Sequence, residues 1–183
     1  MGMFHIIDDI LTKYEGNDTI VSIPEGIKRI KSDTFSPSMR EIREIKLPKS
    51  LEMIDDAAFI GMLIESIVIP AGVKEIGYKS FHECHNLKKI VFSKGLDVIG
   101  EYAFCGNACK SISIPNTVLE VKEYAFCDCR NLEKVVIPNS VQSIGQKAFA
   151  MNDRLKTVSI PSRFKNNLEQ IFEDVEGIKF IFL

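Results

Sequence analysis

A repeat of 22 to 24 residues runs through nearly the whole chain and constrains its fold more than any other feature. In each of seven copies a proline, replaced once by a serine, is followed eleven residues later by a phenylalanine. The anchor residues are Pro24, Pro48, Pro70, Ser93, Pro115, Pro138 and Pro161. The phenylalanines are Phe35, Phe59, Phe81, Phe104, Phe126, Phe149 and Phe172. Because one copy cannot bury its apolar residues alone, the spacing predicts a solenoid whose stacked copies share a core.

The residues around each anchor predict the path of one turn of the coil. The positions three and one before the anchor are apolar in every copy, as at Ile112 and Ile114, which is the period of a short strand with one face inward. Proline ends the strand because it has no N–H to donate to a ladder. Apolar residues three and six after the anchor, such as Val118 and Val121, predict a second wall. The phenylalanine, which follows a small residue in most copies, predicts a tight return through a turn or a short 3₁₀ segment.

One copy carries a family resemblance. Residues 132–149, LEKVVIPNSVQSIGQKAF, resemble the BspA-type leucine-rich repeat pattern L-x-x-I-x-I-P-x-x-V-x-x-I-G-x-x-A-F-x-x-C. The cysteine of that pattern is present at Cys84 and Cys129 and is replaced by Asn107 and Asn152 in other copies. The resemblance implies a right-handed leucine-rich repeat solenoid that binds proteins, often at cell surfaces, and it implies no catalytic residues.

Taken together, these patterns predict a single leucine-rich repeat domain with a parallel β ladder of about seven to eight rungs. We expect an N-terminal cap over residues 1–17, repeats over 18–161, and a C-terminal cap over 162–183. In the N-terminal cap, residues 4–7 and 10–14 flank Asp8 and Asp9, which predicts a two-residue β-hairpin that covers the first rung.

The C-terminal cap is expected to be a helix followed by one more strand. Ser162 is a candidate N-cap and Gly177 a candidate stop. The residues between them that follow helical spacing are Phe164, Leu168, Ile171, Phe172 and Val175. Aligning the last strand with the copy 23 residues earlier makes Phe180 and Phe182 face away from the core, on an open edge that invites pairing with a second copy. The expected oligomeric state is a monomer or a weak homodimer.

Composition excludes several classes of function and sets an expected location. Net charge is −2 and the basic residues are scattered, which argues against nucleic acid as a partner. No apolar run approaches the roughly 20 residues of a membrane-spanning helix, so we expect no membrane insertion. Five cysteines, an odd number, favour reduced thiols. With no visible signal or anchor we expect a cytoplasmic protein, or a surface or secreted one if the chain has been trimmed.

A search for catalytic motifs finds only near misses, so we expect no enzyme activity and no cofactor. Residues 72–80, GVKEIGYKS, have one residue too many before the lysine for a phosphate-binding loop, and residues 82–85, HECH, lack the histidine spacing of a metalloprotease. One column does gather metal-ligating types. His82, Cys105 and Cys127 each follow a column phenylalanine, so a metal or redox site there is a less favoured alternative.

The outer face of the strand ladder is the surface that the repeat leaves free to vary. We expect it to bind a protein or peptide partner, because repeat proteins use regular faces of this kind for binding. The residues predicted to contact that partner are Lys46, Val68, Lys89, Val91, Ser113, Lys134, Val136 and Ser159. The alternative function is a structural or self-associating protein that dimerises through the last strand. Valine and serine at exposed strand positions also fit β-propensity alone.

Overall fold

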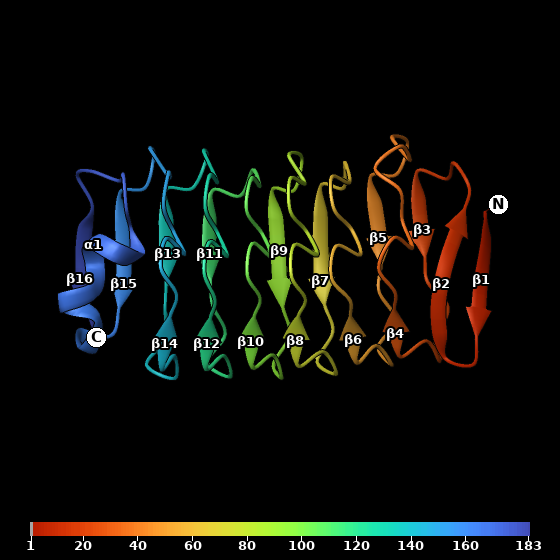
Figure 1. Ribbon diagram of the computed structural model, residues 1–183, viewed down its shortest axis with the longest axis horizontal. Helices are drawn as coiled ribbons and strands as arrows, with labels where there is room; N and C mark the ends of the chain where they lie inside the picture. Colours follow the sequence, from red (N-terminus) through yellow and green to blue (C-terminus); the bar gives the residue numbers. More distant parts are fainter. Residues whose placement is uncertain (1) are drawn as a thin grey trace.

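The computed structural model describes residues 2–183 and shows a β-solenoid with two walls of short parallel strands (Figure 1). The front wall consists of two four-stranded sheets: β3 (Ile20–Ser22), β5 (Glu44–Lys46), β7 (Ser66–Ile69) and β9 (Lys89–Phe92), then β11 (Ser111–Ser113), β13 (Lys134–Val136), β15 (Thr157–Ile160) and β16 (Lys179–Phe182). The back wall is one eight-stranded sheet: β1 (Met3–Ile7), β2 (Ile10–Glu15), β4 (Arg29–Ile30), β6 (Met53–Ile54), β8 (Glu75–Ile76), β10 (Val98–Ile99), β12 (Glu120–Val121) and β14 (Ser143–Ile144). The predicted fold class is confirmed.

The column of phenylalanines forms a continuous stack inside the coil. All seven rings are buried, and successive ring centroids lie 5.0 to 5.5 Å apart. Tyr14 of the hairpin continues the stack beyond Phe35 with a centroid distance of 5.4 Å. The stack therefore sets nearly the same spacing between successive copies as the strands do, because neighbouring strands in a sheet lie about 4.8 Å apart.

Each phenylalanine lies in a return turn that leads from the back wall to the front wall. In the five turns centred on Phe59, Phe81, Phe104, Phe126 and Phe149, the N–H groups of the phenylalanine and of the residues two before and two after it donate to carbonyls of the next copy. These distances are 2.7 to 3.2 Å. The residues two before and two after the phenylalanine have φ between 50° and 77°, and this alternation turns all three N–H groups toward the same neighbour. The returns therefore form a third hydrogen-bonded ladder.

The predicted N-terminal hairpin is confirmed. β1 and β2 are antiparallel, Ile7 pairs with Ile10, and Asp8 has the positive φ of 56° that such a two-residue turn needs. β2 then pairs in parallel with β4 through Leu11 and Ile30, so the hairpin covers the first rung of the back wall.

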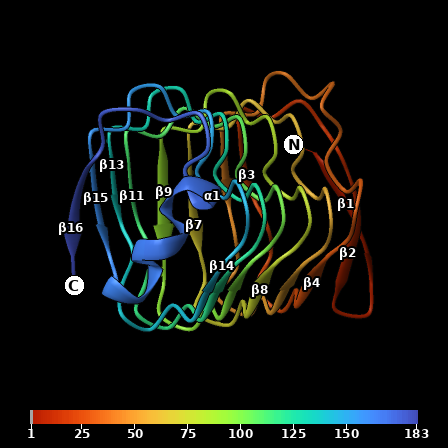
Figure 2. The ribbon, with the colours of Figure 1, turned by 60° about the vertical axis from the view of Figure 1, so that its left-hand side comes forward.

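The C-terminal cap differs from its prediction in two ways, although Figure 2 shows a helical segment at this end of the coil, as expected. First, the segment is a 3₁₀ helix η1 (Ser162–Asn167) followed by a single α-helical turn α1 (Leu168–Ile171). Ser162 does not cap it, because its hydroxyl donates to the Leu183 carbonyl at 2.9 Å. Gly177, with φ 72°, lies in the turn before β16 and not at the helix end.

Second, the orientation predicted for Phe180 and Phe182 is wrong, because Phe182 pairs with Ile160 and its ring stacks on that of Phe180 on the same face of the strand. β16 pairs Val158 with Phe180 and Ser159 with Ile181, one residue away from the predicted alignment. Phe180 is half-buried with its ring 5.3 Å from that of Phe172, and Ile181 takes the outward position. The cause is a return that is one residue shorter than in the copies used for the alignment, and a slip of one residue exchanges the two faces of a strand.

Two neighbouring strand pairs of the front wall, β5 with β7 and β9 with β11, have little or no pairing, and a short return precedes each of these two joints. The count from the column phenylalanine to the first inward strand residue is nine for Val135 and Val158 but eight for Ile67 and Ile112. β7, which follows one short return, pairs with β5 only at Glu44 and Ser66, and β11, which follows the other, has no pairing with β9. Figure 1 shows wider separations at these two joints than between neighbouring front-wall strands elsewhere. The back wall stays continuous through both.

Replacing Phe104 by alanine should lower the free energy of unfolding by about 3 to 5 kcal/mol, the usual cost of removing a buried phenylalanine. The ring lies between Phe81 and Phe126, so its loss breaks the stack in the middle. Urea denaturation followed by circular dichroism measures the change. Leu119→Ala on the outer back wall, where the side chain is 44% exposed, is the control and should change it by no more than about 0.5 kcal/mol. Equal effects of the two variants would contradict a role for the stack.

Candidate functional site

The structure brings all eight residues of the predicted binding set onto the outer surface of the front wall. Val68 and Val91 are 55% and 39% exposed and pair across β7 and β9. Ser113, Val136 and Ser159 follow one another across β11, β13 and β15. Lys46, Lys89 and Lys134 are exposed on the same surface. The placement agrees with the prediction, whereas the binding role of these residues stays a prediction.

The outward strand positions of the front wall carry an excess of positive charge, although the net charge of the whole chain is −2. Four of these positions are lysines and only one is acidic: Lys46, Lys89, Lys134 and Lys179, and Glu44. Within residues 2–183, Lys46 is the one of the four with an ion pair, to Glu44 at 3.8 Å. Three cations are therefore available to an acidic partner.

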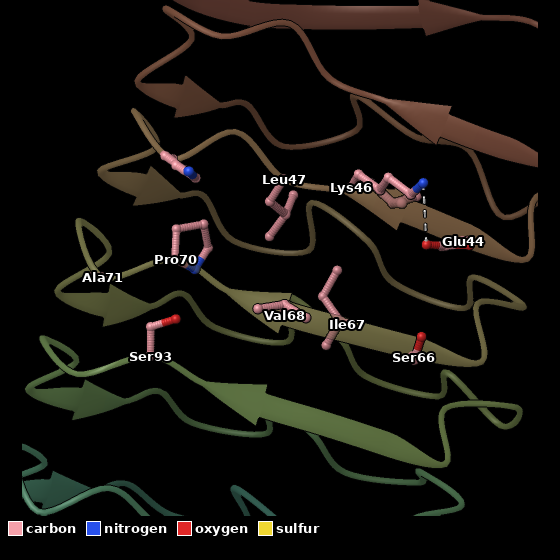
Figure 3. Close-up of a pocket in the computed structure, with 11 residues that line it drawn as sticks. Glu44, Lys46, Leu47, Ser66, Ile67, Val68, Pro70, Ala71 and Ser93 are labelled. Atoms are coloured by element: carbon pink, nitrogen blue, oxygen red, sulfur yellow. Dashed lines mark ion pairs between the residues drawn. The ribbon is translucent and has the colours of Figure 1, made fainter.

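A groove of about 490 Å³ opens in this wall at the joint between β5 and β7 (Figure 3). Its apolar lining comes from both strands and from the residues that follow them: Ile45, Leu47, Ile67, Val68, Pro70 and Ala71. Its polar lining consists of Glu44, Lys46, Lys49, Ser66 and Ser93. Figure 3 shows the Glu44–Lys46 ion pair and Ser66 together at one end, with Pro70, Ala71 and Ser93 toward the other.

Sequence reasoning found Lys46 and Val68 but missed the rest of this groove. The spacing places Leu47 one residue before the anchor, at a position predicted to face inward. That position is fully buried at Ile69 and Ile114, but it is only half-buried at Leu47. The signal was present in the sequence as the eight-residue return from Phe59 to Ile67, one residue shorter than the return that begins at Phe81.

The column proposed as an alternative metal or redox site does not assemble a set of ligands. His82 has Glu83 at 3.6 Å and the Tyr102 ring 6.0 Å away, and burial lowers the pKa of its imidazole. Cys105 and Cys127 are buried free thiols that share a hydrogen bond, which together with burial raises the pKa of Cys105. In the part of the chain that the structure describes, no group of three or more His, Cys, Asp or Glu side chains could hold a metal ion.

The other three cysteines lie in the core and act as small hydrogen-bond donors. Cys84 donates to the Phe59 carbonyl at 3.1 Å, Cys109 to Leu87 at 3.2 Å, and Cys129 to Phe104 at 3.3 Å. Burial raises the pKa of Cys84 and of Cys109 to about 12. These thiols therefore stay protonated near neutral pH and are poor nucleophiles.

Known proteins with a similar sequence pattern or a similar structure agree with this fold. The family model for the BspA type leucine rich repeat region matches residues 7–109 and 97–183. No curated protein matches the chain. Among the residues described, 2–183, no helix is both long enough and apolar enough to cross a membrane.

Two solved structures share the architecture, and a third is a weaker match. A leucine rich repeat protein from T. pallidum is 22% identical, with a TM-score of 0.72 and 97% of this chain and 96% of that chain covered. A leucine-rich repeat protein from Bacteroides ovatus is 21% identical, with a TM-score of 0.53 and 90% and 54% covered. A leucine rich cell surface protein from Faecalibacterium prausnitzii is 21% identical, with a TM-score of 0.41 and 89% and 59% covered. The chain thus spans little more than half the length of the last two, and at these identities the likeness to solved structures concerns the fold alone.

Native protein should react very slowly with Ellman's reagent at pH 8, because all five thiols are buried and so out of contact with the reagent. All five thiols should react at once in guanidinium chloride. Absorbance at the reagent's product band measures both. Fast release of one or two equivalents from native protein, lost in the Cys105→Ser and Cys127→Ser double variant, would restore the redox hypothesis.

Proposed function

Because the chain belongs to the BspA-type leucine-rich repeat family, we propose that it is a non-enzymatic module that binds a protein or peptide partner on its front wall. The family is generally a repeat scaffold without enzymatic activity, and leucine-rich repeats generally mediate protein–protein interaction. The observation that carries the proposal is the row of exposed, mostly uncharged residues that runs along β5, β7, β9, β11 and β13, in which Lys89 and Lys134 have no ion pair within residues 2–183.

The rigidity of this wall supports binding. Its strands are held from behind by the phenylalanine stack and on the far side by a continuous back-wall sheet. A surface that is ordered before the partner arrives does not lose much conformational entropy when it binds, so more of the contact energy appears as affinity.

The charge of the wall supports a partner with an acidic surface. Lys89, Lys134 and Lys179 lack ion pairs among the described residues, so they attract negative charge without first breaking a bond within the protein. Steering of this kind raises the association rate and weakens as salt screens it.

Self-association through the last strand is a second candidate, favoured by the open side of β16. Within residues 2–183, β16 is bonded only to β15, and Ile181, Phe182 and Leu183 are exposed. Since Phe180 packs inward, the outward residue of this edge is Ile181. Sedimentation or light scattering over a range of concentrations tests the candidate, and a strict monomer at the highest concentration removes it.

For location, we propose a reducing compartment and thus the cytoplasm. The support is that all five cysteines are free and buried in a fold whose core does not depend on disulfides. Fractionation of the native cell tests this directly, and recovery with surface proteins would overturn it.

Introducing glutamate together at Val68, Val91 and Val136 should abolish capture of the native partner, because three charges along the wall disturb any complementary surface. The three side chains point outward, so stability should change by less than about 1 kcal/mol. Affinity capture from the native cell, quantified by mass spectrometry, measures binding, and thermal unfolding measures stability.

Met53→Glu with Leu119→Glu is the matched control, since both side chains are exposed on the back wall. This double variant should keep the partner. Loss of the partner from the control alone would place binding on the back wall and contradict the proposal.

A further inference from the structure

At the groove between β5 and β7, hydrogen bonding between neighbouring front-wall strands is interrupted. At regular joints the residue before the anchor donates its N–H to the carbonyl of the outward residue that lies two before the next anchor. Ile114 donates in this way to Val136 at 3.0 Å, and Ile137 donates to Ser159 at 2.8 Å. The equivalent bond would join Leu47 to the Val68 carbonyl, and among residues 2–183 it is not formed. Pairing of the two strands ends at Glu44 and Ser66.

The interruption leaves the Leu47 N–H and the Val68 C=O without the bond that joins their equivalents at regular joints. Groups of this kind bind an extended chain well, because its own N–H and C=O groups can complete the missing bonds. The joint between β9 and β11 lacks pairing as well, and the groove of about 490 Å³ lies at the β5–β7 joint. The β5–β7 joint therefore offers both open backbone groups and space.

The sides of the groove are apolar where the gap is open. Leu47 lies on one side, Val68 and Pro70 lie on the other, and Ile67 lies between the strands (Figure 3). Val68 is 55% exposed, and Leu47 is half-buried at a position that is buried in five of the other six copies. Covering this surface with an aliphatic side chain removes apolar area from water at both partners, which favours binding.

The charges at the groove favour an acidic ligand. Lys49 lines the groove and has no ion pair among the described residues, and Lys46 lines it with only the exposed partner Glu44. Lys89 continues the positive charge on the neighbouring strand β9. A carboxylate of the ligand would therefore be attracted at either lysine, whereas a lysine or arginine there would be repelled.

We propose that the β5–β7 groove binds an extended acidic peptide segment of the partner, with one aliphatic side chain between Leu47, Val68 and Pro70 and separate carboxylates at Lys46 and at Lys49. The segment completes the backbone bonds that β5 and β7 leave open. This inference rests on the proposed function of the front wall and names the chemistry of its partner.

The test uses three acetylated and amidated pentapeptides with the full-length protein labelled with ¹⁵N. They are Glu-Leu-Glu-Leu-Glu, its basic counterpart Lys-Leu-Lys-Leu-Lys, and its polar counterpart Glu-Ser-Glu-Ser-Glu. The acidic aliphatic peptide should shift the amide signals of Leu47, Ser66 and Val68 in a saturable titration. The other two peptides should shift them at least about tenfold more weakly, since each lacks either the charge or the apolar contact.

Matched variants separate the groove from the rest of the surface. Val68→Glu should weaken binding by more than about tenfold, and Leu119→Glu, at an exposed apolar residue outside the front wall, should leave it unchanged. Lys49→Glu should weaken binding about fivefold or more, and Lys31→Glu, with the same change in net charge at an exposed lysine outside the front wall, should not. Thermal unfolding confirms that each variant is folded.

Three outcomes overturn the inference. They are equal loss in Val68→Glu and Leu119→Glu, preference for the basic peptide, and groove signals that shift on dilution of the protein alone, which would mean a second copy occupies the groove. If no peptide shifts the groove while the triple front-wall variant still loses its partner, the groove inference fails and the proposed function stands. If the peptide binds the groove but the triple variant keeps its partner, the proposed function fails.

Discussion

The fixed rise from one copy to the next is the constraint on which the rest of this structure depends. Strand bonding in the two walls, the hydrogen bonds between returns and the phenylalanine stack all require neighbouring copies to lie about 5 Å apart. Each turn of the chain must therefore close with nearly the same length of backbone. Where a return is one residue short, not every ladder can stay aligned. The back wall and the stack are retained at both interior short returns, and the front wall gives way instead.

Much of this architecture was predictable from the sequence because the repeat encodes it twice, in polar-to-apolar alternation and in spacing. Phe126 marks the return and Ile114 the inward face of a strand, and both are buried as expected. The hairpin at Asp8 followed from local turn chemistry. What escaped prediction depends on the returns. An alignment of the copies on their prolines does not reveal a return that is one residue short. For that reason the pairing of Phe180 and the opening beside Leu47 were both missed.

The interchange of cysteine and asparagine three residues after the phenylalanine has a physical explanation in the returns. The thiol of Cys129 donates to the Phe104 carbonyl, and the amide of Asn152 reaches the Phe126 carbonyl at 3.0 Å and its own Phe149 carbonyl at 2.7 Å. Either residue thus donates to a carbonyl of the previous copy, and the Phe104 carbonyl also accepts from the amide of Asn107 at 2.8 Å. The cysteines are used for hydrogen bonding within the core, in keeping with an unreactive role.

The ladder of return turns also gives the solenoid a net peptide dipole along its axis. In a β-sheet successive peptide dipoles oppose each other, but here three peptides in each of five turns have their N–H groups directed toward the C-terminal neighbour. Aligned peptides add to a macrodipole, with its positive end where the donors point. That end is the C-terminal cap, the reverse of an α-helix. Four acidic residues, Glu169, Glu173, Asp174 and Glu176, line one hollow at this cap, which is the end of such a dipole where negative charge is favourable.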